Sequence, residues 1–395
     1  MPHLPASLPH GRDIHEEHRV ATPLELLYDL VFVIAIAACA SSLHHAIAGH
    51  HYGEIATYAI VFVPVWWAWM NYTWFSSAFD VRDGWFRLLS FVQMFGALLL
   101  AAGMKAFFAG DGRLVLVGYI VMRIAMVTFW LRVAWQDARY RPTALRYGLG
   151  ILVLQGLWVG WYLVTKDMGP TVVFSTMLVF IAAELLIPVL AERVKHTPWH
   201  PHHIAERYGL LTIIVLGEAV LGVSNTIVNA DRSHLQSAIS CGFAGSLLVF
   251  LLWWFYFQVS FVGALHSHDL RRGLIFGYGH YLVFASLAAV GSGLGLVADT
   301  FLATEAGHAV SNQTAILTLA VAVTVYLLTV CLIRWLAVGQ GPPRLLACLV
   351  ALGLLTGAAF ACQMHLPIWA GLLMIAAAPA ALTTWQTHCQ AGHGD

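Results

Sequence analysis

Charged side chains are scarce in this sequence. Asp, Glu, Lys and Arg together make up 10% of its 395 residues, whereas hydrophobic residues make up 59%. Soluble domains carry about 25% charged residues. The mean hydropathy is +0.75, so there is too little polar surface to cover a water-soluble globule. This composition excludes an ordinary soluble domain and predicts an integral membrane protein whose main partner is the lipid bilayer.

Several other features are missing. Lys plus Arg and Asp plus Glu both total 20, so no excess charge favours binding to nucleic acid. None of the 6 cysteines forms a C-x-x-C pair, which argues against a thiolate metal site. The first residues lack the apolar core of a cleavable signal peptide. We also find no catalytic nucleophile motif and no metal-ligand spacing, and therefore expect no catalytic residues, cofactor or metal.

Long apolar runs, in contrast, are abundant. Runs of about 20 apolar residues cross a bilayer as helices. We therefore expect an all-α polytopic integral membrane protein with about twelve transmembrane helices. Only a short turn separates the last two runs, so eleven is the alternative count. The expected spans are 24–46, 54–78, 86–104, 113–134, 145–165, 171–191, 206–228, 235–262, 274–300, 312–336, 343–362 and 365–385.

The distribution of Lys and Arg over the expected loops predicts the orientation of the chain. Cytoplasmic loops are enriched in these residues. With the N-terminus in the cytoplasm, that side receives fifteen of them and the other side receives four, which are Lys105, Arg113, Lys166 and Arg232. Both termini are therefore expected in the cytoplasm, which agrees with an even number of spans.

Two stretches of the chain resemble each other at a separation of about half its length. Glu25-Leu-Leu-Tyr28 and Glu206-Arg-Tyr208 open the first and seventh spans, and Trp66-Trp67 recurs as Trp253-Trp254. This pattern predicts two parallel six-helix repeats, related by an axis along the membrane normal. The alternative is chance recurrence of common membrane motifs. The expected parts are an N-terminal tail 1–23, halves 24–195 and 196–385, and a C-terminal tail 386–395.

Two carboxylates stand one turn apart at the entrance of the first span. Thr22, Pro23 and Glu25 have the spacing of a capping box, which gives Glu25 a structural role in addition to a candidate functional one. Asp29 lies one turn further on the same face and has no capping role. The two acids are candidates for holding a proton or cation. The alternative is an ion pair with Arg19 or with another Arg across the bundle.

Glu218 lies in the middle of an apolar run. It follows Glu206 and Arg207 at the span entrance by about 18 Å of helix, which places it near the bilayer midplane. A charged group there is costly and is commonly functional, so Glu206 and Glu218 are further candidates for proton or cation binding. Gly217 and Gly222 flank Glu218 and would allow close helix contact. The alternative is a carboxyl group that only supports packing.

Three other titratable side chains are expected inside the membrane with supporting roles. Arg123 needs an acidic partner, and Glu184 is the nearest by depth, with Glu218 as the other. His280 titrates near neutral pH when exposed, but a lone His is more often packed and hydrogen-bonded. Two histidine clusters lack a recognised zinc spacing. The second cluster, residues 196–203, contains prolines and is expected to form a loop.

Two long motifs resemble the bacterial low temperature requirement A (LtrA) family. The first is Arg19-Val-Ala-Thr-Pro-Leu-Glu-Leu26 with Asp29-Leu-Val-Phe-Val33, and the second is Glu206-Arg-Tyr-Gly-Leu210 with Ile213-Ile-Val-Leu-Gly-Glu218. The resemblance covers about residues 15–385 and implies a bacterial inner membrane location and a phenotype of growth in the cold. It implies no reaction. One departure is visible: Asp80 and Asp83 are separated, where the family has adjacent acids.

Three functions fit these observations. The first is a secondary transporter or ion-conducting protein that uses intramembrane carboxylates to bind a proton or small cation. The second is a membrane sensor or scaffold in cold adaptation. The third is a membrane-embedded lipid-modifying enzyme, which the short loops disfavour. The sequence leaves the substrate and the oligomeric state open.

Overall fold

The computed structural model describes residues 10–13, 16, 19–80, 83–266, 269–302, 310–339, 345–364 and 366–391. Parts of the expected tails 1–23 and 386–395 therefore lie outside the described residues. The described chain is helical apart from β1 (His10–Gly11) and β2 (Phe79–Asp80), which pair antiparallel. The chain divides into two compact units, residues 1–38 with 60–207 and residues 39–59 with 208–395.

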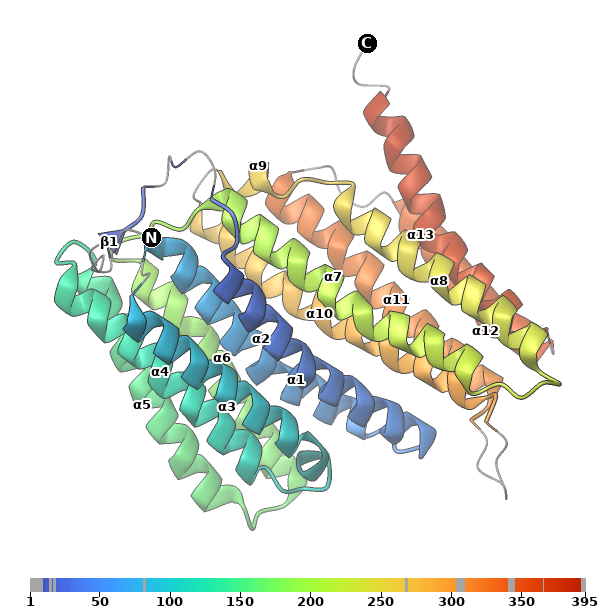
Figure 1. Ribbon diagram of the computed structural model, residues 1–395, viewed down its shortest axis with the longest axis horizontal. Coiled ribbons are helices and arrows are strands. Elements are labelled where there is room, and N and C mark those ends of the chain that lie inside the picture. The colour runs from blue at the N-terminus through green and yellow to red at the C-terminus, as the bar shows by residue number, and fades with distance from the viewer. Residues whose placement is uncertain are drawn as a thin grey trace. The chain divides into compact units, whose positions relative to one another are not determined.

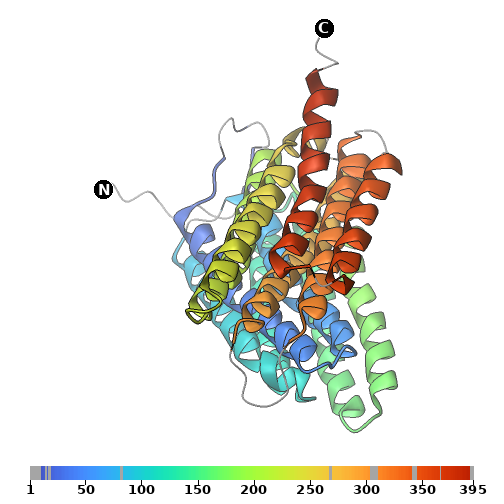
Figure 2. The same ribbon diagram turned by 90° about the vertical axis from the view of Figure 1, so that its right-hand side faces the viewer.

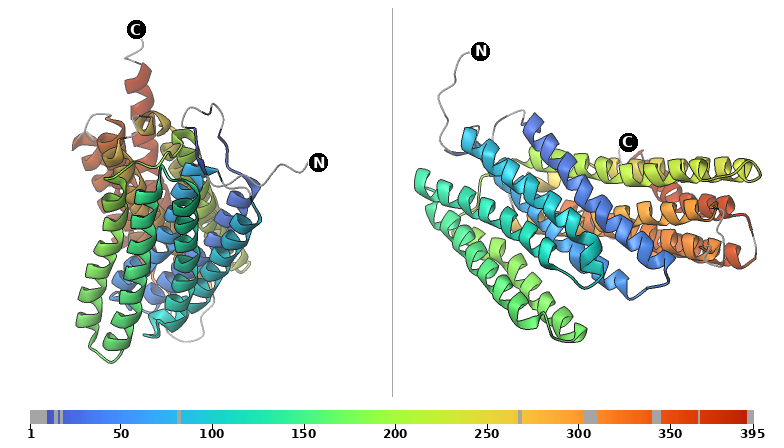
Figure 3. Two further views of the ribbon diagram at one scale, coloured as in Figure 1. Left: turned by 90° about the vertical axis from the view of Figure 1, so that its left-hand side faces the viewer. Right: turned by 60° about the horizontal axis from the view of Figure 1, so that its bottom comes forward.

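The first unit is built around an antiparallel series of helices. These are α3 (Gly84–Phe108), α4 (Arg113–Gln136), α5 (Arg141–Thr165) and α6 (Pro170–Glu192), which run side by side in sequence order (Figures 1 and 3). Glycines let α3 and α4 pack closely, because a Cβ on Gly118 would lie 2.5 Å from the backbone nitrogen of Leu100. The unit also contains the first part of α1 (Pro23–Ala48), most of α2 (Glu54–Ala78) and the first turns of α7 (Pro201–Val228).

The second unit contains the remainder of α1, α2 and α7 with the C-terminal helices. These helices are α8 (Leu235–Phe257), α9 (Val262–Leu265), α10 (Leu270–Asp299), α11 (Asn312–Ile333) with the π-helix η1 (Arg334–Val338), α12 (Leu345–Gln363) and α13 (Ile368–Ala391). Helix α10 packs against α11, and α13 packs against α8 and α12 (Figure 2). Hydrogen bonds from Tyr58 to the carbonyl of Ala285 (2.7 Å) and from Ser292 to that of Ala40 (2.7 Å) tie α10 to the ends of α2 and α1.

The expectation of an all-helical membrane protein is confirmed. Nine helices of the described chain are long and apolar enough to cross a membrane, among them α1, α7 and α10. Many apolar side chains on these helices are exposed, as a lipid-facing surface requires. Several helix boundaries differ from expectation by a few residues. The start of α7 differs most clearly, since α7 begins at Pro201 and includes His202 and His203, where a loop was predicted. Proline suits the first position of a helix because its missing N–H needs no partner there.

Candidate functional site

The start of α1 has the predicted capping box. The backbone nitrogen of Glu25 donates to Thr22 Oγ1 at 3.3 Å, and the backbone nitrogen of Thr22 donates to Glu25 Oε2 at 2.7 Å. The Thr22 hydroxyl also donates to Glu25 Oε2 at 2.8 Å. A cap of this kind stabilises a helix by about 1 kcal/mol. These contacts occupy one oxygen of Glu25, so its other oxygen is directed toward the neighbouring elements.

Asp29 forms a bidentate ion pair with Arg207. The guanidinium donates from Nε to Oδ2 at 3.0 Å and from Nη2 to Oδ1 at 2.6 Å. Trp69 on α2 adds a third donor, with its indole nitrogen 2.6 Å from Oδ1. Both Asp29 and Arg207 are 0% exposed. This geometry favours the ion pair over proton or cation binding at Asp29, because its two oxygens are occupied by donors.

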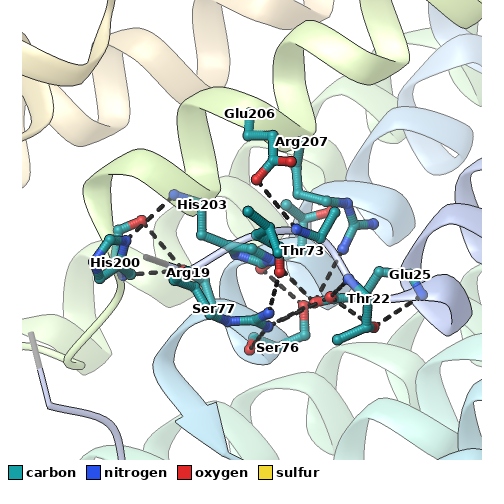
Figure 4. A network of polar contacts seen from close by, with 12 residues as sticks. Arg19, Thr22, Glu25, Thr73, Ser76, Ser77, His200, His203, Glu206 and Arg207 are labelled. Atoms are coloured by element: carbon teal, nitrogen blue, oxygen red, sulfur yellow. Dashed lines mark hydrogen bonds and ion pairs between the residues drawn. The ribbon is translucent and has the colours of Figure 1, made fainter. Parts of the chain in front are cut away.

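Arg207 also links Asp29 to Glu25. Its Nη1 lies 3.3 Å from Glu25 Oε1, and Arg19 Nη2 lies 3.1 Å from the same oxygen. His203, one turn before Arg207 on α7, places Nε2 3.1 Å from that oxygen as well (Figure 4). The positive charges of two guanidinium groups therefore balance the negative charges of two carboxylates in a buried network. The network joins residues that are 178 positions apart in the sequence.

The N-terminal segment is held against the start of α7. The backbone nitrogen of Ala21 donates to a carboxylate oxygen of Glu206 at 3.1 Å, and His200 Nε2 lies 2.7 Å from the carbonyl oxygen of Glu16 (Figure 4). The hydroxyl of Ser77 accepts from the backbone nitrogen of His200 at 3.0 Å. Burial lowers the pKa of His200, so this imidazole is neutral at physiological pH. Glu206 thus holds the chain segment that enters α1.

A second buried ion pair lies within the first unit. Arg123 Nη2 on α4 is 2.7 Å from Glu184 Oε2 on α6, as the depth of the two residues predicted. Trp67 donates from its indole nitrogen to the same oxygen at 3.0 Å. The two charged side chains are 1% and 3% exposed. Arg123 therefore has the acidic partner that a cation at this depth requires.

Glu218 differs from these carboxylates. In the part of the chain that the structure describes, it has no ion-pair or hydrogen-bond partner, and its side chain is half-buried. It packs against α10 at Gly291, where a Cβ would lie 2.8 Å from Glu218 Cγ. Gly222 permits the same close approach, since a Cβ there would lie 3.1 Å from the backbone nitrogen of Gly295. Gly217, in contrast, has open space around it.

An imidazole–carboxylate pair lies near Glu218 in the same unit. His44 Nε2, near the end of α1, is 2.6 Å from Asp299 Oδ2 at the last residue of α10. Their side chains are 23% and 25% exposed. His44 packs against α10 at Gly295, where a Cβ would lie 3.1 Å from His44 Nδ1, one turn from the contact of Glu218 with Gly291. The His44–Asp299 pair and Glu218 thus lie one turn of α10 apart.

His280 is a packed and fully hydrogen-bonded histidine. Its Nδ1 lies 2.6 Å from the carbonyl oxygen of Phe276, and its Nε2 lies 2.8 Å from the Tyr256 hydroxyl. It is 0% exposed and stands among aromatic rings, including that of Tyr208 at 4.8 Å between centroids. Nδ1 donates to the carbonyl, and Nε2 shares its hydrogen bond with the Tyr256 hydroxyl, so both ring nitrogens have a partner. This arrangement supports packing.

Comparison with protein families identifies the chain. A family profile described as "Bacterial low temperature requirement A protein (LtrA)" matches residues 20–381. The chain belongs to the LtrA family. The matched region includes every charged residue of the two buried ion-pair clusters except Arg19, and it includes Glu218, His44 and Asp299.

The LtrA chain is also similar to the "Uncharacterized protein RA0937" of Rhizobium meliloti (strain 1021). The two are 27% identical over 260 residues, which is 59% of this chain and 57% of that protein. The match thus spans a little over half the length of that relative. No solved structure matches the chain.

In this LtrA chain, the structure brings together residues from the two motifs on which the family resemblance rests. Asp29 of the first motif binds Arg207 of the second, while Glu218, at the end of the second motif, lies in the other unit. Trp69 was not predicted as part of the site, and His44 was considered only as a member of a histidine cluster without a recognised zinc spacing. An imidazole near the end of an apolar span was the available signal for His44, but its partner Asp299 is 255 residues away.

Proposed function

We propose that this LtrA protein is a secondary transporter or ion-conducting protein that moves a proton or small cation across the bacterial inner membrane. Glu218 is the exchanging group. The observation that carries the proposal is the contrast between this carboxylate and the others: Glu25, Asp29 and Glu184 each lie against an arginine, whereas Glu218 has no partner among the described residues. A carboxylate without a resident cation can bind and release one.

The position of Glu218 supports this role. It lies about 15 Å from the C-terminal end of α7, well inside the membrane-spanning part of the helix. A charge at that depth costs about 2.5–3.5 kcal/mol to insert, so an unpaired carboxylate is expected to be either protonated or bound to a cation. Its side chain is half-buried, so it is not sealed between the packed helices. The neutralised network around Arg207 then acts as a rigid support in the first unit.

The wider architecture proposed with this function has twelve spans in two parallel six-helix halves, residues 24–195 and 196–385. Both termini are in the cytoplasm, as the bias of Lys and Arg indicates. Parallel repeats are found in transporters whose ion sites lie near the membrane midplane, where we place Glu218.

Ion flux in proteoliposomes tests the proposal. Purified protein is reconstituted with a pH-sensitive dye, and flux of protons, sodium and potassium is measured under a diffusion potential. We expect flux in the wild type and its loss in Glu218→Gln, which keeps the size of the side chain and removes its charge. Glu54→Gln, in the first turn of α2, is the matched control and should behave as wild type.

Two results would contradict the proposal. Unchanged flux in Glu218→Gln would exclude this carboxylate as the exchanging group. The absence of any flux in the wild type, with all three ions tried, would exclude the transport function and leave the sensor and enzyme alternatives.

A further inference from the structure

We propose that His44 and Asp299 form a proton relay between water at one membrane surface and Glu218, so that the ion moved is the proton. This inference rests on the proposed function and specifies its ion and its access route. It concerns residues of the second unit alone, contributed by α1, α7 and α10.

The first support is the placement of the pair at the ends of its helices. His44 lies four residues before the end of α1, and the following residues 49–53 are exposed. Asp299 is the last residue of α10. About a quarter of each side chain is exposed, 23% for His44 and 25% for Asp299. The pair is therefore within reach of water, whereas Glu218 lies deeper.

The second support is a glycine face on α10 that both side chains share. A Cβ on Gly295 would lie 3.1 Å from His44 Nδ1, and a Cβ on Gly291 would lie 2.8 Å from Glu218 Cγ. Residues 291 and 295 are one turn apart on the same face of the helix, separated by about 6 Å along its axis. His44 and Glu218 therefore lie against successive turns of α10, and the two glycines make the room for them.

The third support is that the two ring nitrogens of His44 have different neighbours. Its Nε2 is 2.6 Å from Asp299 Oδ2 and donates to this carboxylate. That bond leaves Nδ1, the nitrogen nearest Gly295, as the atom that accepts a proton. His44 takes a proton from bulk water at Nδ1, and the Asp299 carboxylate stabilises the resulting imidazolium through Nε2–H. The proton on Nδ1 is then released to the Glu218 carboxylate, which becomes the neutral acid while the ring returns to its neutral form. Movement in the opposite direction reverses the same steps.

The ligand chemistry favours the proton over a metal cation. Hard cations such as Ca²⁺ take about six to eight oxygen ligands, and among the described residues no three His, Cys, Asp or Glu side chains are grouped so that they could hold a metal ion. The charged and titratable groups around His44 are Asp299 on α10, the neighbouring His45 on α1 and, one turn of α10 away, Glu218 on α7. His45 is exposed and bonds through Nδ1 to the carbonyl oxygen of Ser41 at 2.6 Å, which keeps it out of the relay.

The test measures proton flux in proteoliposomes for His44→Gln and for the matched control His45→Gln. Glutamine at position 44 can still donate to Asp299 but cannot carry a proton. We expect a loss of about a hundredfold in proton flux, the usual contribution of a positioned acid–base group, and no change in the control. In His44→Ala, added imidazole should restore part of the flux, a result that a purely structural role of His44 would not give. Asp299→Asn should slow the flux and change its pH profile.

Three outcomes would overturn the relay. Wild-type proton flux in His44→Gln would remove His44 from the path. Failure of imidazole to restore any flux in a His44→Ala protein that elutes and melts as wild type would assign His44 a structural role. Sodium or potassium flux without proton flux in the wild type would leave the proposed function standing and exclude the relay. The absence of flux of every tested ion in the wild type would exclude both the relay and the proposed transport function.

Discussion

Replacing Asp29 by Asn tests whether the network around Arg207 is structural. The substitution keeps one oxygen that can accept from Trp69 but removes the charge that Arg207 binds through two hydrogen bonds, at 3.0 and 2.6 Å. Arg207 is 0% exposed, and its only remaining anionic partner in the network would be Glu25, whose Oε1 lies 3.3 Å from Arg207 Nη1. Removing one partner of a buried ion pair costs about 3–5 kcal/mol, because the other charge stays buried without compensation. We expect a loss of stability of that size.

The assay is unfolding in mixed micelles, followed by tryptophan fluorescence, for Asp29→Asn, Arg207→Met and the double variant Asp29→Leu with Arg207→Met. The double variant removes both charges, so it should recover most of the stability lost by the single variants. Asp111→Asn is the matched control. It breaks an exposed pair with Arg113, which water and salt screen, and should unfold as wild type.

Wild-type stability of Asp29→Asn would refute this reasoning, because it would mean that Arg207 does not need the charge of Asp29. Loss of ion flux in such a stable variant would then favour the alternative of proton or cation binding at Asp29. Loss of both stability and flux, with the double variant recovering both, would identify the pair as a support for the transport path.

Two further predictions concern a glycine contact and a pH effect. Gly291→Ala places a methyl group 2.8 Å from the Cγ of Glu218, the proposed exchanging carboxylate. We therefore expect a loss of stability of about 1–3 kcal/mol and reduced flux. Gly217 has open space around it, so Gly217→Ala should change neither stability nor flux. The Arg139 guanidinium, with the backbone nitrogen of Gly11, lowers the pKa of Asp137 from its ordinary value of 3.8 to about 2. This stabilisation is therefore complete above about pH 4 and is lost as the pH falls toward 2, which hydrogen exchange at Gly11 should report.

Local patterns in the sequence predicted the short-range features well. The capping box of Thr22 and Glu25 depends on residues three positions apart, and both of its hydrogen bonds are present. Apolar runs of sufficient length predicted the helices, because a bilayer leaves the backbone little alternative. The pairing of Arg123 with Glu184 followed from depth alone, since a cation inside an apolar bundle needs an anion at the same level.

Contacts between distant segments were not predictable in the same way. Arg19 or another arginine was the predicted partner of Asp29. The partner in the structure is Arg207, because the first turns of α7 pack at the start of α1. The contacts of His203 with Glu25 and of Trp69 with Asp29 likewise depend on how the helices pack. The pairing of His44 with Asp299 joins two helix ends that no local pattern connects.

The distribution of arginines distinguishes Glu25, Asp29 and Glu184 from Glu218. A guanidinium stays protonated under all physiological conditions, so a carboxylate that it neutralises cannot exchange a cation unless the pair first breaks. Asp29, Glu25 and Glu184 are held in this way. Glu218 instead packs against α10 one turn from His44, whose charge changes with its protonation. A carboxylate beside a histidine can pass through neutral and charged states without breaking a permanent ion pair, which is the property that ion exchange at the membrane midplane requires.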